Sequence, residues 1–179
     1  MIFTATPLPG AFVVDLEPRT DARGFFARTF CRAEFQRHGL EPDIVQCSVS
    51  HNRHRGTLRG LHYQAAPHEE AKLVSCIRGA IHDVIVDLRP TSPAFRRPFA
   101  LVLRADEHRA LYIPKGLAHG FLTLEDDAEV FYQMSVPYAP ACARGVRWND
   151  PAFGIAWPEP PQHLSERDRT YPDFQGPDH

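Results

Sequence analysis

Proline and glycine interrupt this chain so often that it can form only short segments of regular structure. Seventeen prolines and eleven glycines separate many apolar runs within 179 residues. Short apolar runs divided by turn-forming residues are typical of β-sandwiches and barrels. The sequence therefore predicts an all-β fold, with strands over 11–17, 44–50, 58–64, 72–79, 80–89, 99–105, 110–116, 118–125, 129–136 and 145–150. Short helices are expected only within 21–39 and around 164–168.

Several of the predicted strands are apolar on both faces. Successive side chains of a strand alternate, so Ile81 and Ile85 must point away from the face that carries Val84 and Val86. A strand of this kind needs cover on both sides. Two sheets packed face to face in a jelly roll supply one cover, and the partner subunit of a homodimer is the expected source of the other.

Length and composition predict one domain over residues 1–179. With 43% hydrophobic residues the chain can bury one substantial core, and two full domains would be a tight fit. After Trp157 the composition becomes polar and proline-rich, so residues 158–179 are expected to wrap the surface. A formal charge of −2 and scattered arginines give no field that would attract a phosphate backbone, which argues against nucleic-acid binding.

Cysteine usage and hydropathy predict a soluble cytoplasmic protein. Cys31, Cys47, Cys76 and Cys142 lie far apart and form no C-x-x-C pair, so reduced thiols are expected. The first eighteen residues lack the basic start of a signal peptide and are broken by prolines. No uncharged apolar run approaches the roughly 18 residues of a membrane helix.

Two of the ten histidines, His62 and His119, differ from the rest because they fall in strand-like runs near glycines. A lone histidine in a strand is usually a core residue with a satisfied hydrogen bond. Here the P-x-G-x-x-H spacing of 114–119 resembles the second motif of the cupins, a jelly-roll superfamily. The fold expected from this resemblance is a cupin-type jelly roll with short peripheral helices.

The first cupin motif is matched only in part, by His62-x-Gln64 followed by Glu69 and Glu70. Metal-binding cupins carry a second histidine where this chain has Gln64, and an amide is a poor ligand for a transition metal. A metal-dependent dioxygenase or isomerase that uses His62, His119 and one of the two glutamates remains an alternative.

Read together, the polar motifs resemble the dTDP-4-dehydrorhamnose 3,5-epimerase family, whose members are metal-free cupins. The matching segments run in order along nearly the whole chain: RGFF (23–26), LRGLHYQ (58–64), KLV (72–74), DVIVDLR (83–89), IPKGLAHGF (113–121), WNDP (148–151) and LSERD (164–168). The resemblance implies an isomerase of deoxysugar biosynthesis that inverts carbons beside the ketone of a nucleotide-linked sugar, as a homodimer and without a metal or redox cofactor.

The chemistry implied needs a base, a donor for the enolate oxygen and an acid on the opposite face. By family position His62 is the base and Asp168 orients it, in the manner of a triad carboxylate. Lys72 stabilises the enolate, unless it forms only a solvated salt bridge with Glu69 or Glu70. Tyr132 matches the proton donor, because a phenol with a pKa of about 10 stays protonated at neutral pH.

The nucleotide end of such a substrate needs charge-assisted donors and a flat surface. The family positions for substrate binding map onto Arg23, Gln46, Ser48, Arg59, His119, Tyr138 and Arg167. Arg59 and His62 are three residues apart, so a regular strand would send them to opposite faces. Either Gly60 marks a bulge, or Arg59 serves a site shared with a partner subunit.

Four positions depart from the family pattern: Arg28 and Ala143 replace glutamates, Ser48 replaces an asparagine and Gln133 replaces a lysine. These residues are expected on the substrate-binding side, so they put the identity of the sugar in doubt. A third hypothesis is a silent sugar-nucleotide binding module, which would be favoured if one of the four catalytic candidates were missing.

Overall fold

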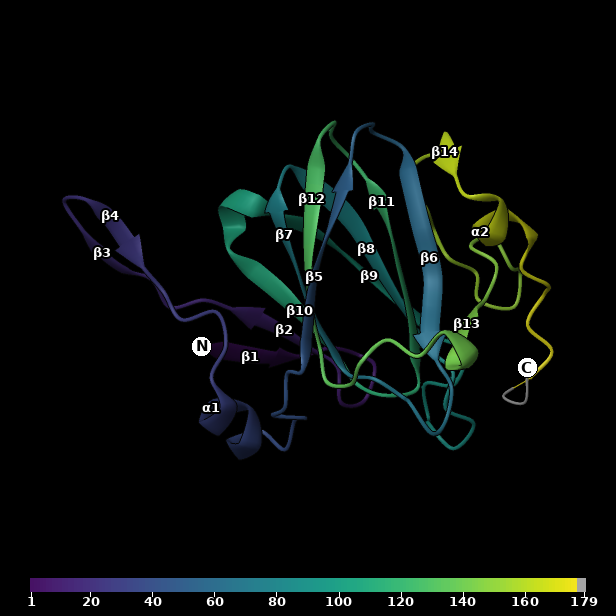
Figure 1. Ribbon diagram of the computed structural model, residues 1–179, viewed down its shortest axis with the longest axis horizontal. Coiled ribbons are helices and arrows are strands. Elements are labelled where there is room, and N and C mark those ends of the chain that lie inside the picture. Colours follow the sequence, from purple (N-terminus) through teal and green to yellow (C-terminus); the bar gives the residue numbers. More distant parts are fainter. Residues whose placement is uncertain (177–179) are drawn as a thin grey trace.

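Two antiparallel β-sheets pack face to face in the computed structural model, which describes residues 1–176 (Figure 1). One sheet has the order β1 (Ile2–Ala5), β2 (Phe12–Asp15), β10 (Arg109–Ile113), β7 (Lys72–Arg78), β12 (Ala128–Met134) and β5 (Gln46–Asn52). The other has the order β13 (Ala143–Gly145), β6 (Thr57–Gln64), β11 (Leu117–Thr123), β8 (Ala80–Asp87) and β9 (Pro98–Arg104), and β14 (His163–Leu164) runs parallel to β6. The predicted all-β jelly roll is confirmed.

Peripheral elements complete the chain. A hairpin of β3 (Arg19–Asp21) and β4 (Gly24–Phe26) projects away from the two sheets (Figure 1). Helix α1 (Arg32–Arg37) follows it, and α2 (Glu166–Thr170) lies beside β6. The short 3-10 turns are η1 (Ala105–Glu107) and η2 (Pro140–Cys142). Both expected short helices are thus present, although the hairpin and β1 were not foreseen.

The expected strand over 145–150 is wrong except at Gly145, where β13 ends. The backbone of Val146 still exchanges hydrogen bonds with Leu61, but the chain then turns. The carboxylate of Asp150 accepts hydrogen bonds from the backbone N–H groups of Ala152 and Phe174. A side chain that caps its own turn in this way competes with strand pairing.

Both faces of β8 are buried, as the alternation predicted. Ile81 and Ile85 pack in the core between the two sheets. Val84 and Val86 pack on the opposite face, against buried side chains that include Phe153. The prediction that a partner subunit covers this face is therefore wrong, because the cover comes from residues 146–174 of the same chain.

The C-terminal segment pairs with a β-strand and contributes buried residues. Its β14 pairs with the start of β6, and Ser165 caps α2 by accepting a hydrogen bond from the N–H of Asp168. Two side chains of this segment, Asp168 and Phe174, are themselves buried. The last three residues of the expected wrapping segment 158–179 lie outside the described residues. Among the helices described, none is both long enough and apolar enough to cross a membrane.

A bulge in β6 resolves the spacing problem between Arg59 and His62. Opposite β11, His62 pairs with His119 and Arg59 pairs with Phe121, so β6 has one more residue than β11 between these two pairs. The extra residue restores the parity, and both side chains line the same cavity. Of the two explanations considered from sequence, the bulge at Gly60 is the one observed.

The bulge requires glycine in both strands. Gly60 has φ +130°, and a Cβ there would lie 2.5 Å from the Cα of Gly120. A Cβ on Gly120 would lie 2.8 Å from the carbonyl oxygen of Arg59. Because the obstructing atoms belong to the backbone, neither contact can be relieved by a side-chain rotation.

We expect Gly60→Ala to destabilise the fold by about 3 kcal/mol or more, because it adds a backbone clash to an unfavourable φ. Gly24→Ala is the matched control, since Gly24 has φ +129° but open space around its Cα. Equilibrium unfolding in urea measures both free energies. Equal losses for the two variants would contradict the close packing at Gly60.

Candidate active site

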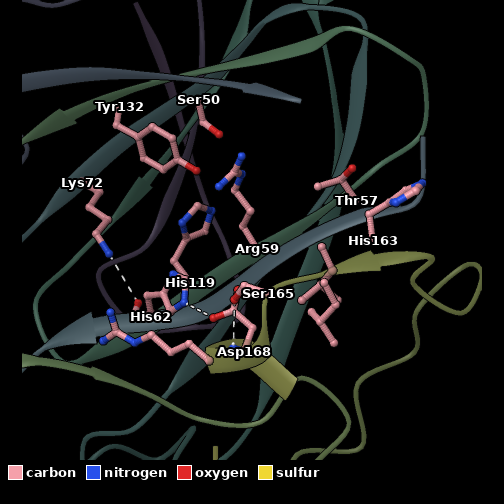
Figure 2. A pocket seen from close by; sticks show the side chains of 13 residues that line it. Ser50, Thr57, Arg59, His62, Lys72, His119, Tyr132, His163, Ser165 and Asp168 are labelled. Atoms are coloured by element: carbon pink, nitrogen blue, oxygen red, sulfur yellow. Dashed lines mark hydrogen bonds and ion pairs between the residues drawn. The ribbon is translucent and has the colours of Figure 1, made fainter. Parts of the chain in front are cut away.

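A cavity of about 560 Å³ opens between the two sheets and the C-terminal segment (Figure 2). Side chains from both sheets and from β14–α2 line it: Ser50, Thr57, Leu58, Arg59, His62, Lys72, His119, Tyr132, His163, Leu164, Ser165, Arg167 and Asp168. All four residues expected to be catalytic are therefore brought together. Three expected binding residues, Arg59, His119 and Arg167, line the same cavity.

His62 and Asp168 form a hydrogen-bonded pair across 106 residues of sequence. The His62 Nε2 lies 2.6 Å from the Asp168 Oδ1 (Figure 2). The Asp168 side chain is only 5% exposed, whereas that of His62 is 42% exposed. The carboxylate therefore sits behind the imidazole, and the ring faces the cavity.

The environment of Asp168 keeps its carboxylate ionised. Burial opposes the charge, but hydrogen bonds from His62, Ser165 and the Gly60 N–H, together with the charge of His62, outweigh it and lower the pKa of Asp168. An ionised Asp168 accepts the hydrogen on His62 Nε2, which leaves the lone pair on Nδ1. This is the tautomer that a general base needs.

Lys72 is buried rather than solvated. Its Nζ lies 2.9 Å from the Glu70 Oε1 and donates to the backbone carbonyl of His62 at 3.4 Å. The structure thus combines the two roles weighed from sequence, because the ammonium lines the cavity and also pairs with Glu70. Glu69, the other candidate partner, is exposed.

Tyr132 reaches the cavity from β12, in the sheet opposite the one that carries His62. Burial raises the pKa of the phenol, and the negative charge of Asp83 raises it further, while Arg59 has the opposite effect. The phenol is therefore protonated at neutral pH. Tyr132 and His62 face one cavity from opposed sheets, as Figure 2 shows.

A second His–Asp pair lies beside Tyr132. His119 Nε2 is 2.7 Å from the Oδ1 of Asp83, and both residues are buried. The rings of His119 and Tyr132 meet edge to face, with centroids 5.9 Å apart. Asp83 is not among the functional residues predicted from sequence. Its place in DVIVDLR, on a buried strand, could have indicated it, because a buried carboxylate needs a partner.

Arg59 and Arg167 face the cavity without an acidic partner. Arg59 Nε donates to the Asn52 side chain at 2.7 Å, and the Arg167 guanidinium lies over the ring of Tyr171, 5.7 Å from its centroid. Within residues 1–176, no carboxylate lies within ion-pair distance of either guanidinium. Their charges are thus available to an anionic ligand.

Gln46, Ser48 and Tyr138 lie next to the cavity rather than on its lining. The Gln46 Oε1 accepts a hydrogen bond of 2.9 Å from the Tyr138 N–H, which holds the backbone of a residue that is 55% exposed. Ser48 pairs with Tyr132 in the register of β5 and β12. On the same face of β5, Ser50 does line the cavity but was not foreseen.

Arg23 is not part of this cavity. It lies in the projecting β3–β4 hairpin with 89% of its side chain exposed, and its guanidinium pairs with Asp21. Phe26 in the same hairpin is 78% exposed. The predicted substrate contact of Arg23 is therefore absent within one chain.

Two of the four departures from the family pattern, Arg28 and Gln133, lie away from the cavity of their own chain. Gln133 is on the outer face of β12, since the neighbouring Tyr132 points inward. Arg28 forms an ion pair with Glu34 near the N-terminus. Ala143 pairs with Gln64, whose amide holds the backbone of the loop that leads to Tyr138.

The donors for the metal alternative do not converge. In the part of the chain that the structure describes, no three His, Cys, Asp or Glu side chains are disposed to hold a metal ion. His62 and His119 each bind a separate aspartate through Nε2, and Glu70 binds Lys72. This arrangement does not fit a shared metal site.

The fold and the cavity define a jelly-roll protein with paired acid–base groups and two unpaired arginines. A model of the family "dTDP-4-dehydrorhamnose 3,5-epimerase" matches residues 5–176. A protein of that name from Mycolicibacterium smegmatis is 44% identical over 169 residues, which is 92% of this chain and 82% of the relative. The chain therefore belongs to the dTDP-4-dehydrorhamnose 3,5-epimerase family, whose members are isomerases.

Two solved structures illustrate the similarity. The Bacillus anthracis dTDP-4-dehydrorhamnose 3,5-epimerase with TDP and PPi bound has a TM-score of 0.93 and 38% identity, and the match covers 97% of this chain and 99% of that one. ChmJ, a 3'-monoepimerase from Streptomyces bikiniensis in complex with dTDP-quinovose, has a TM-score of 0.85 and 38% identity, with coverage of 94% and 85%.

The pH dependence of stability tests the buried pair. The pKa of Asp168 is lower in the native protein than in the unfolded chain, so its ionised carboxylate stabilises the fold. This contribution is complete above about pH 4 and is lost as the pH falls through the native pKa. We expect Asp168→Asn to cost about 1–3 kcal/mol at pH 7 and progressively less below pH 4. Urea unfolding from pH 7 to pH 2.5 measures the difference.

Asp106→Asn is the control, because the Asp106 side chain is 80% exposed. Its free energy of unfolding should stay within about 0.5 kcal/mol of the wild type throughout. A cost for Asp168→Asn that does not change with pH would show that the charge of Asp168 does not contribute.

Proposed function

We propose that this chain is an epimerase that inverts C3, C5 or both in a dTDP-linked 4-keto-6-deoxyhexose, as a step of deoxysugar biosynthesis. The observation that carries the proposal is the placement of an oriented base and a protonated phenol on opposed sheets of one cavity. Inversion requires a proton to leave one face of a carbon and another to arrive on the other face. A cavity with a base and an acid on facing walls meets that requirement.

In the forward step, His62 Nδ1 removes a proton from the carbon beside the ketone. The C–H electron pair moves into the new carbon–carbon double bond, and the carbonyl oxygen becomes an enolate. The ammonium of Lys72 stabilises that oxygen. Asp168 stabilises the imidazolium that forms and does not itself take up the proton.

In the return step, Tyr132 delivers its proton to the same carbon from the opposite face. The enolate collapses to the ketone, and the configuration of the carbon is inverted. The phenolate and the imidazolium then regain their starting states by exchange with solvent. No metal or redox cofactor takes part in these steps, since every proton and electron pair is accounted for by the protein and the sugar.

The charges around the cavity support a nucleoside diphosphate as the carrier of the sugar. Lys72 is paired with a carboxylate, whereas Arg59 and Arg167 are not. A diphosphate would complete the coordination of the two guanidinium groups, and the exposed ring of Tyr138 offers a surface for the base. Thymine is the base named in the ligands of both similar structures, which favours dTDP.

The similar proteins differ in the number of carbons that their names say they invert. The family name specifies positions 3 and 5, while ChmJ is a 3'-monoepimerase. Both reactions use the same enolate oxygen, because C3 and C5 flank one ketone. The proposed base, enolate donor and acid serve either outcome.

We also propose that the protein acts as a homodimer in which the β3–β4 hairpin completes the partner's cavity. The hairpin carries Arg23 and Phe26 out into solvent, and within one chain they contact no part of the cavity. The outer face of the β5–β12–β7 sheet also exposes Val49 and Ile77. A second copy placed there would cover both features.

Two further proposals complete this description. We infer that residues 1–179 act as one domain, since the C-terminal segment supplies both Asp168 and buried core residues. We infer a cytoplasmic location, which is consistent with cysteines that are free throughout the described chain.

The reaction itself is tested with dTDP-4-keto-6-deoxyglucose in heavy water. The wild type should incorporate solvent deuterium and invert the labelled carbon, as followed by NMR. Tyr132→Phe should keep incorporation, because His62 can return deuterium to the original face, while inversion falls by on the order of 10²–10⁴. His62→Asn should lose both, yet still bind TDP in calorimetry.

One deuterium in the product identifies a single epimerase and two identify a double epimerase. Unlabelled sugar from an enzyme that binds TDP would favour the silent binding module. Incorporation that stops after treatment with a chelator and returns with added metal would favour the metal-dependent alternative.

Subunit mixing tests the shared cavity. Arg23→Ala and His62→Asn homodimers should each be nearly inactive. If the hairpin acts in trans, heterodimers of the two variants contain one intact site. Random exchange of subunits should then restore about a quarter of the wild-type rate. A mixture that stays inactive although exchange is demonstrated by mass spectrometry would exclude the shared site.

A further inference from the structure

The contacts of Lys72 involve a residue that no part of the mechanism has yet used. Lys72 is 8% exposed, and the side chains of Lys72 and Glu70 are similarly buried, at 10% and 11% exposure. The Lys72 Nζ to Glu70 Oε1 distance of 2.9 Å is that of a charge-assisted hydrogen bond. Such a pair is held in one geometry, unlike a solvated surface ion pair.

The second contact of Lys72 is made with the backbone of the base. Its ammonium donates to the carbonyl of His62 at 3.4 Å, as the dashed line in Figure 2 shows. An ammonium has three N–H donors. Glu70 and the His62 carbonyl take two of them, which leaves one for a ligand in the cavity.

We infer that Glu70 is a positioning residue for the epimerisation, which fixes the Lys72 ammonium so that its remaining N–H meets the enolate oxygen. This inference rests on the proposed function. Glu70 lies on the segment just before β7 and Lys72 is the first residue of that strand, so the carboxylate limits the swing of a side chain with four rotatable bonds. Without the contact to Glu70, the lysine side chain would have to be ordered in each turnover, at a cost in conformational entropy.

The neighbouring glutamate provides a natural comparison. Glu69 is exposed and lies on a different cavity, with Tyr63 and Leu88, on the far side of β6. Of these two adjacent carboxylates, the one that contacts the Lys72 ammonium is that of Glu70. The sequence EEAK cannot show which of the two is the partner.

A double-mutant cycle tests the inference, with kcat and KM measured by the deuterium assay. Lys72→Met should lower kcat by on the order of 10²–10³. Glu70→Ala should lower kcat on the order of tenfold and leave KM within about twofold, because the contact matters when charge develops on the oxygen. Glu70→Gln, whose amide oxygen can accept the same hydrogen bond, should restore most of the rate.

The decisive comparison is the effect of Glu70→Ala in the Lys72→Met background. If Glu70 acts through Lys72, the second substitution changes kcat by less than about twofold. A further tenfold loss in that background would overturn the inference, as would a Glu70→Gln variant no faster than Glu70→Ala. Glu69→Ala should match the wild type.

The failure of this inference is distinguishable from failure of the proposed function. An inactive wild type refutes the epimerase itself, whereas an active wild type with additive variants refutes only the role of Glu70. Thermal unfolding of each variant separates a loss of fold from a loss of rate. A Glu70→Ala protein whose kcat falls only where it unfolds would also overturn the inference.

Discussion

The close approach of the β6 and β11 backbones at Gly60 and Gly120 is the constraint on which the site depends. It permits the bulge that turns Arg59 and His62 toward the same cavity. The bulge also presents the Gly60 N–H to the Asp168 carboxylate, at 3.5 Å. A regular strand would keep the sheet but would place the arginine and the base on opposite faces. The bulge is therefore the feature of β6 that brings the side chains of Arg59 and His62 into one cavity.

The charged groups of the cavity fall into two sets, those paired with a carboxylate and those without one among the described residues. His62, His119 and Lys72 each contact their own carboxylate, from Asp168, Asp83 and Glu70. Each carboxylate is buried or nearly so, which makes the interaction stronger than it would be in water. The two arginines keep their charge for a ligand. The positive charge of the cavity that no carboxylate within residues 1–176 balances therefore comes from Arg59 and Arg167.

The sequence predicted most of the fold, because strand patterns and turns are local signals. Strands from 44–50 to 129–136 appear close to their expected positions. The predicted strand over 145–150 is wrong because Asp150 caps a turn there. Residue propensity does not reveal this competition between a side-chain cap and strand pairing. The predicted cover of β8 by a partner subunit is wrong because the pattern shows that Val84 and Val86 need packing partners, but does not show which segment provides them. The residues of the site came from the family resemblance, whereas their second contacts, such as those of Asp83 and Glu70, required the fold.

Inversion at one carbon or at two poses a geometric question that the base and acid alone do not answer. C3 and C5 lie on either side of the same ketone, so in the proposed mechanism the oxygen that meets Lys72 serves both enolates. What differs is which carbon lies between the nitrogen of His62 and the hydroxyl of Tyr132. His62 is held by Asp168 and Tyr132 is held by its place in β12, so in the proposed mechanism the sugar must turn while its oxygen stays in place. The residues that allow or prevent this turn must contact the sugar hydroxyls rather than the reacting carbon. In the proposed mechanism, the number of carbons inverted is therefore set by the walls of the cavity and not by its base and acid.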